Sequence, residues 1–187
     1  MSKILFLDIE TTGFSREWDE IIEIAAILID EETGKDVDSF HEYIKPHKNI
    51  TAKITELTRI TNAQVMGCRS ESMVLMDFSE WVTISHAKSI ISHNGKTFDL
   101  QFIREKCNKY DITWNEPLNI VDTLVVARAL KKCGKINVEN CQQKTLAEYF
   151  GIEYNAHSAI DDVRALIQIH KKMTKLTQPT SRADLGF

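Results

Sequence analysis

Hydrophobic positions near the N-terminus of the chain form short apolar runs. The runs at residues 4–7 and 21–29 are rich in Ile and Leu, the segment at 37–44 mixes β-branched and aromatic residues with polar ones, and polar or turn residues separate the three. Such runs predict β-strands. Only a short turn at residues 31–35 joins the second run to the third, which predicts an antiparallel hairpin. We therefore expect the sheet to begin as three antiparallel strands.

Farther along the chain, short apolar runs alternate with segments of helical periodicity. Buried strands are predicted at residues 89–92 and from residue 119, and the latter strand leads into a helix that ends near residue 130. Four more helices are predicted at about 72–85, 97–110, 145–150 and 156–172. This order indicates an α/β fold, with a mixed sheet covered by helices. We expect one domain at residues 1–173 and a mobile polar tail at residues 174–187.

Composition narrows the class of protein. The 187 residues are 43% hydrophobic and 27% charged, as in soluble globular domains. No apolar run approaches the length of a membrane span, and residues 1–3 leave no room for a signal peptide, so we expect a cytoplasmic protein without a membrane partner. The four cysteines lack ligand spacing, which argues against zinc. A net charge of −4 argues against bulk binding of duplex DNA but not against an acidic metal-dependent nuclease.

Several acidic residues stand where the hydrophobic pattern alone does not place them. Asp8 and Glu10 end the first strand two residues apart, and the two-residue period of a strand puts both carboxylates on one face. Such a pair favours a divalent cation, because Mg²⁺ prefers carboxylate oxygens. The alternative is that both acids simply end the strand in solvent. Asp99 lies in the first turn of a predicted helix, where the helix dipole favours an acid with or without a ligand.

The last predicted helix carries a further acid on its apolar side. Asp162 is in helical phase with Leu166 and Ile169, and a buried acid needs a partner or a metal. Asp161 lies on a more polar face and is the better candidate for a solvated acid. His157, near the start of this helix, is within reach of the same cleft.

Taken in order, these segments resemble the three motifs of the DEDDh, or DnaQ-like, 3′–5′ exonuclease family, which includes proofreading subunits of bacterial replicative DNA polymerases. The motifs are Asp8-x-Glu10-Thr11-Thr12-Gly13, Asn94-x-x-x-Phe98-Asp99 and His157-x-x-x-x-Asp162. The resemblance covers about residues 3–170. It implies an RNase H-like fold with a mixed five-stranded sheet, its first three strands antiparallel, flanked by helices.

The resemblance also implies the site residues and the reaction. Two Mg²⁺ or Mn²⁺ ions are implied, with His157 as general base and four acids as ligands: Asp8, Glu10, Asp99 and Asp162. The implied substrate contacts are Thr11, Thr12, Gly13, Phe14, Asn94 and Phe98. The implied reaction is phosphodiester hydrolysis at the 3′ end of single-stranded nucleic acid, with release of nucleoside 5′-monophosphates. DNA is the expected substrate.

Two other functions stay open at this point. An RNA-trimming exonuclease of the same family would carry the same motifs, since no residue shows how a 2′-OH is treated. A catalytically silent binding subunit of a polymerase would keep the fold without the chemistry, although all four acids and the histidine are present. The end of the tail, Leu185-Gly186-Phe187, loosely resembles peptides that dock into bacterial sliding clamps, but it lacks their leading glutamine.

Other polar and aromatic residues are assigned supporting roles. Glu23 is expected to be a buried, hydrogen-bonded acid, and Asp122 to support rather than ligate. Trp18 is expected to pack in the core or at an edge, with a place facing the substrate as the alternative, because it lies in the loop after the first motif. Four histidines have no partners at metal-ligand spacing and are expected at the surface: His41, His47, His86 and His170. A loosely basic region is expected to be either a solvated face or a phosphate contact, and it consists of Lys131, Lys132, Lys135 and Lys144.

Overall fold

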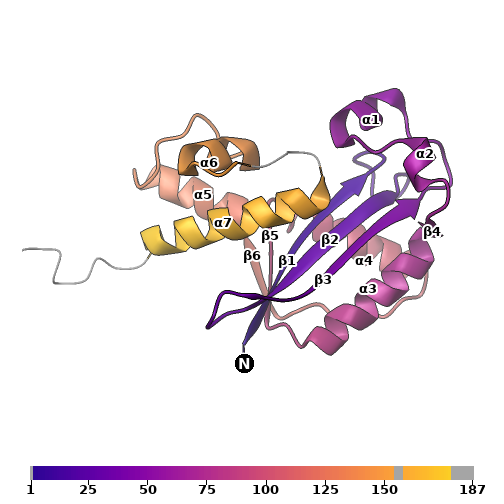
Figure 1. Ribbon diagram of the computed structural model, residues 1–187, viewed down its shortest axis with the longest axis horizontal. Helices are drawn as coiled ribbons and strands as arrows, with labels where there is room; N and C mark the ends of the chain where they lie inside the picture. The colour runs from indigo at the N-terminus through magenta and orange to yellow at the C-terminus, as the bar shows by residue number, and fades with distance from the viewer. Residues whose placement is uncertain (1, 154–157, 178–187) are drawn as a thin grey trace, which may run out of the picture.

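The computed structural model describes residues 2–153 and 158–177, in which one mixed sheet forms the centre (Figure 1). Its strands are β1 (Lys3–Thr11), β2 (Ile21–Asp30), β3 (Asp36–Lys45), β4 (Arg69–Ser70), β5 (Ser89–Ser92) and β6 (Asn119–Asp122). They lie in the order β4-β3-β2-β1-β5-β6. β2 pairs antiparallel with both β1 and β3, whereas β5 is parallel to β1 and β6 to β5. This confirms the α/β class and the antiparallel start of the sheet.

The sheet has one strand more than predicted among the described residues. β4 has only two residues, which pair in parallel with Ile44 and Lys45 at the end of β3. A two-residue strand is too short to leave a periodic hydrophobic pattern, so the sequence did not indicate it.

Helices cover both faces of the sheet (Figure 1). They are α1 (Ala52–Thr58), α2 (Asn62–Val65), α3 (Glu71–Ser85), α4 (Asp99–Lys109), α5 (Thr123–Lys132), α6 (Gln143–Phe150) and α7 (Ala159–Thr177). α3 and α4 pack on one face, and α7 packs across β1 and β2 on the other, with α5 and α6 beside it. Among the described residues no helix combines the length and the hydrophobicity needed to span a bilayer.

Alternation along β1 decides which way its acids point. Leu5 and Leu7 pack in the cluster formed with α3 and α4, whereas Phe6 packs in the cluster formed with α7. Asp8 and Glu10 have the same parity as Phe6, so they continue the side of the strand that faces α7. α7 begins near this end of β1, and the strand therefore directs both acids toward the first turn of that helix.

α7 is longer than its periodicity indicated. It ends at Thr177, so residues 174–177, which were assigned to the tail, are helical instead. Met173 near this end is fully buried in a cluster with α5 and α6, which gives the last turns something to pack against. Residues 178–187, with the expected clamp-docking segment, lie outside the described residues. The division into a domain and a tail stays a prediction.

Candidate active site

Three carboxylates meet at the end of β1. Ligand oxygens of Asp8, Glu10 and Asp162 all lie within 4.8 Å of one another, although the third acid is about 150 residues away along the chain. They line a cleft of about 210 Å³ together with Asp99. The structure thus brings all four predicted acids into one cleft.

Asp99 lies at the start of α4 and is 3% exposed. The backbone N–H of Ile9, between the two acids of β1, donates a hydrogen bond to Oδ1 of Asp99 (3.2 Å). This bond ties the start of α4 to β1 and leaves the other carboxylate oxygen available. Asp99 lines the cleft without belonging to the closely spaced group of three.

The cleft makes full ionisation of these acids unfavourable. Burial, followed by the charge of Asp162, raises the pKa of Glu10 to about 8. Burial raises the pKa of Asp99 to about 7, even though backbone hydrogen bonds lower it. The pKa of Asp8 is raised well above its usual value, first by burial and then by the charge of Asp99. A divalent cation would remove this mutual repulsion, and carboxylate oxygens are the ligands that Mg²⁺ and Mn²⁺ prefer.

Two side chains outside the predicted motifs position the start of α7. Nε2 of Gln143 donates to the carbonyl oxygen and to Oδ1 of Asp162, both at 3.0 Å. Glu23 pairs with Glu10 across β2 and β1, is fully buried, and accepts a hydrogen bond from the N–H of Ala159, the first residue of α7 (3.2 Å). The expected structural role of Glu23 is confirmed. Its second oxygen lies 2.7 Å from Nε2 of His41, which is exposed, as expected of a surface histidine.

Replacing Glu23 with Ala is expected to lower Tm by roughly 5 °C or more, because a lost hydrogen bond to a charged group is worth about 1.5–3 kcal/mol. It should also weaken Mn²⁺ binding about tenfold or more, since the start of α7 loses its attachment to β2. Thermal unfolding and calorimetric titration measure the two effects. Glu23→Gln retains an oxygen for the N–H of Ala159 and should restore most of both. Equal Tm and Mn²⁺ affinity in the Ala variant and the native protein would rule out the positioning role.

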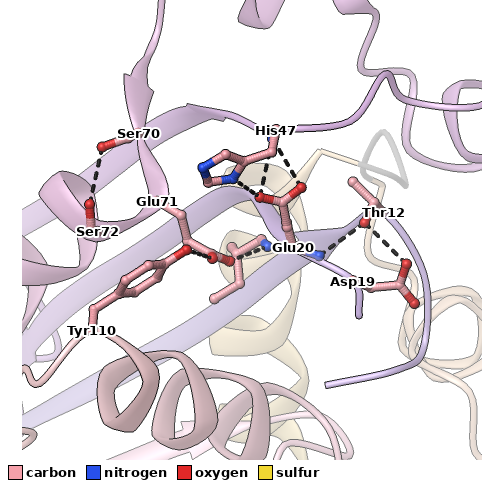
Figure 2. Close-up of polar contacts among 9 residues, drawn as sticks. Thr12, Asp19, Glu20, His47, Ser70, Glu71, Ser72 and Tyr110 are labelled. Carbon is pink, nitrogen blue, oxygen red and sulfur yellow. Dashed lines mark hydrogen bonds and ion pairs between the residues drawn. The ribbon is translucent and has the colours of Figure 1, made fainter. Parts of the chain in front are cut away.

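Polar side chains hold the loop that follows β1 (Figure 2). The hydroxyl of Thr12 accepts a hydrogen bond from the N–H of Glu20 (2.9 Å) and donates to Oδ1 of Asp19 (3.3 Å). A Cβ at Gly13 would lie 2.4 Å from Oδ2 of Asp19, so the close approach of this carboxylate requires glycine. The buried Thr11 donates to the carbonyl oxygen of Gly13 (2.6 Å). The polar side chains of the first motif therefore shape the loop, whatever contact they make with substrate.

Two buried acids fix the neighbouring start of β2 (Figure 2). Glu71 accepts hydrogen bonds from the N–H of Ile21 (2.7 Å) and from the hydroxyl of Tyr110 (2.8 Å). Glu20 accepts from the N–H of His47 and lies 2.5 Å from Nδ1 of the same residue. His47 is exposed, as expected, and pairs with Glu20. The partners in these hydrogen bonds lie 27 to 50 residues apart in the sequence, so no local sequence pattern predicts them.

Phe98 lines the cleft and contacts a second aromatic ring, that of Phe14 in the loop after β1. The ring of Phe14 is 79% exposed and meets the ring of Phe98 edge to face, with 6.1 Å between centroids. Nη2 of Arg16 donates to the carbonyl oxygen of Thr97 (3.0 Å), so the loops of the first two motifs are also joined by a hydrogen bond. Trp18 is 69% exposed, so it does not pack in the core, and the alternative place facing the substrate stays a prediction.

The loop before α4 is shaped by Asn94 and Asp122. Asn94 has a φ of 66°, and its Oδ1 accepts a hydrogen bond from the hydroxyl of Thr97 (2.7 Å). The carboxylate of Asp122 accepts from the N–H groups of Asn94 (3.0 Å) and Lys96 (3.3 Å), which agrees with its expected supporting role. His157 lies outside the described residues, so its place at the cleft stays a prediction.

Comparison with known proteins identifies the family. The model for RNase_T, described as Exonuclease, matches residues 5–170. The chain belongs to this exonuclease family. The resemblance to the DEDDh, or DnaQ-like, 3′–5′ exonucleases is thereby confirmed. These are divalent-metal-dependent enzymes, which fits the acidic cleft.

Relatives place this exonuclease domain in larger proteins. The chain is 38% identical over 165 residues to the PolC-type DNA polymerase III of Clostridium perfringens, covering 88% of this chain but 11% of the polymerase. The corresponding Bacillus subtilis polymerase is 32% identical, with 90% and 11% covered. The chain thus spans about a tenth of the length of these relatives.

Solved structures share the fold. The zinc-bound complex of E. coli exonuclease I with single-stranded DNA superimposes with a TM-score of 0.83 at 26% identity, covering 96% of this chain and 42% of that one. The nuclease domain of 3′hExo, a DEDDh family member bound to rAMP, gives a TM-score of 0.72 at 21% identity, covering 93% and 92%. The second likeness concerns the fold alone.

Proposed function

We propose that this chain is a metal-dependent 3′–5′ exonuclease domain that removes nucleoside 5′-monophosphates from single-stranded DNA. The observation that carries the proposal is the convergence of Asp8, Glu10 and Asp162 within 4.8 Å, beside Asp99, in a chain of the exonuclease family. A silent binding subunit would have no need of clustered acids whose charges raise the pKa of Asp8 and of Glu10. Their retention in one cleft favours chemistry.

The four acids are proposed to hold two Mg²⁺ or Mn²⁺ ions. Bound there, such ions supply an activated water and stabilise the leaving 3′ oxygen of an in-line displacement. Gln143 and Glu23 keep Asp162 and the start of α7 in place for this task. We assign His157 the role of general base, because an imidazole with a pKa of about 6.5 accepts a proton near neutrality.

The substrate end of the cleft is proposed to hold the terminal nucleotide. Phe14 and Phe98 present an exposed aromatic edge on which a base can stack. Thr11, Thr12 and Gly13 shape the loop beside it, and Asn94 shapes the loop across from it. Because these groups address a ring face and a phosphate, cleavage is expected to depend little on base identity.

DNA is the proposed substrate because the polymerase relatives act in DNA synthesis by name and E. coli exonuclease I is complexed with single-stranded DNA. The same relatives motivate a proposed association with a DNA polymerase in the cytoplasm. The second candidate is RNA trimming. It is retained because the 3′hExo nuclease domain, which shares the fold, is bound to rAMP.

A time course on matched 5′-labelled single-stranded DNA and RNA oligonucleotides tests the proposal. With Mg²⁺ or Mn²⁺ we expect a ladder that shortens from the 3′ end, faster on DNA, and with EDTA no cleavage. Faster cleavage of RNA would favour the trimming function. Intact substrates of both kinds, with folded protein and metal present, would favour the binding subunit.

A further inference from the structure

We infer that a second, cationic groove beside the acidic cleft binds the phosphates of the strand upstream of the cleaved bond. This inference rests on the proposed exonuclease function. It concerns a cavity of about 560 Å³ between α5 and the segment that leads into α6. The groove and the acidic cleft share three lining residues, His93, Asn94 and Gln143, so the two hollows are continuous.

The chemistry of the groove suits a phosphodiester backbone. Arg128 and Lys131 stand three residues apart on α5, so both project from one side of the helix. Nζ of Lys131 is held near the groove by a hydrogen bond to the carbonyl oxygen of Glu139 (2.7 Å). Amide side chains of Asn140 and Gln142 add neutral hydrogen-bonding groups. No carboxylate is found among the described residues that line this groove.

The hollow between α1 and the loop that follows β1 has a different character. Its volume is about 780 Å³, and its lining includes the aromatic ring of Phe14 and the aliphatic side chains of Ile54 and Leu57. Two cations, Lys53 and Arg59, also line it, but two acids, Asp19 and Glu56, offset them. The apolar hollow therefore fits a base, whereas the groove at α5, which adjoins the acidic cleft, is lined by cations without carboxylates.

The groove at α5 and the apolar hollow at Phe14 together give the nucleic acid strand a direction through the site. The terminal base lies toward Phe14, the scissile phosphate lies at the acids, and the upstream phosphates leave along Arg128 and Lys131. The distribution of charge supports this order. The chain has a net charge of −4 and four acids in one cleft, so a nucleic acid strand is repelled except where cations line its path. The groove supplies positive charge within reach of the cleft.

The structure also separates the members of the basic region seen in the sequence. Lys131 lines the groove, whereas Lys132, next to it on α5, does not and is exposed. Nζ of Lys135 instead donates to the carbonyl oxygen of Leu176 (2.5 Å). Lys132→Gln is thus a matched control, which removes one positive charge from the same helix turn without touching the groove.

The test compares the double variant Arg128→Gln, Lys131→Gln with native protein and with Lys132→Gln on two substrates. One is the p-nitrophenyl ester of thymidine 5′-monophosphate, which has no upstream phosphate. The other is a single-stranded DNA octanucleotide. We expect kcat/KM of the double variant to fall at least about tenfold more on the octanucleotide than on the ester. Lys132→Gln should match the native protein on both.

Binding of labelled octanucleotide in Ca²⁺, followed by fluorescence anisotropy at several salt concentrations, gives an independent readout. Each lost phosphate contact should reduce the slope of log K against log salt by about 0.7. The groove proposal is overturned if the double variant matches the native protein in salt slope and in rate. It is also overturned if kcat/KM falls equally on the ester and on the octanucleotide. If the native protein hydrolyses neither substrate, the exonuclease function is overturned instead. The salt dependence of octanucleotide binding still tests whether the groove binds phosphates.

Discussion

Replacing Asp8 with Asn is expected to lower the rate of 3′-end cleavage at least about a thousandfold, because clustered ligands act as a unit and their contributions do not add. Asn keeps the size of the side chain but removes a charge from a group of oxygens within 4.8 Å. Initial rates on 5′-labelled single-stranded DNA with Mg²⁺ measure the effect. The metal-free variant should also melt higher than native protein near pH 8, since one of the repelling acids is gone.

Asp161→Asn is the matched control for this prediction. Asp161 precedes Asp162 on α7 but points toward Arg164, with 3.6 Å between Oδ1 and Nη1. Its neutralisation should leave the cleavage rate within about twofold of native, because exposed ion pairs contribute little. Near-native cleavage by Asp8→Asn would show that the metal-site assignment is wrong. Loss of activity in Asp161→Asn would transfer the role of Asp162 to its neighbour.

Metal-free protein is expected to lose thermal stability as the pH rises from 5 to 8. The pKa values of Glu10 and Asp99 are raised to about 8 and about 7, above the unfolded values of about 4. In this window the folded state binds more protons than the unfolded state, so the free energy of unfolding falls as the pH rises. Between pH 5 and 8 the raised pKa values of the two groups sum to about 5 units, or roughly 7 kcal/mol at about 1.4 kcal/mol per unit. Since 1 kcal/mol corresponds to about 2–4 °C, Tm should fall by more than about 10 °C.

Divalent ions should reverse this trend. Mg²⁺ or Mn²⁺ binds the ionised acids, and the gain in Tm on adding metal should therefore be larger at pH 8 than at pH 6. Scanning calorimetry in EDTA and in excess metal measures both curves. Asp8→Asn should flatten the EDTA curve, because it removes one source of repulsion. A metal-free Tm that climbs steadily from pH 5 to pH 8 would contradict the electrostatics of the cleft.

The sequence by itself determined which acids belong to the site and how each is presented. Asp8 and Glu10 share a face because a strand repeats every two residues, and Asp162 lies on the apolar side because a helix repeats every 3.6. These periods are local, so the hydrophobic pattern also predicted most helices and strands to within a few residues. It could not show β4, whose two residues have no period.

Only the tertiary structure decided which distant groups meet. The hydrogen bond from Ala159 to Glu23 spans 136 residues, and the cleft exists because α7 packs across β1 and β2. Likewise, neighbouring Lys131 and Lys132 look alike in the sequence, but of the two only Lys131 lines the groove beside the acidic cleft. Contacts of this kind depend on how whole elements pack against one another, and packing depends on long-range burial rather than on any local pattern.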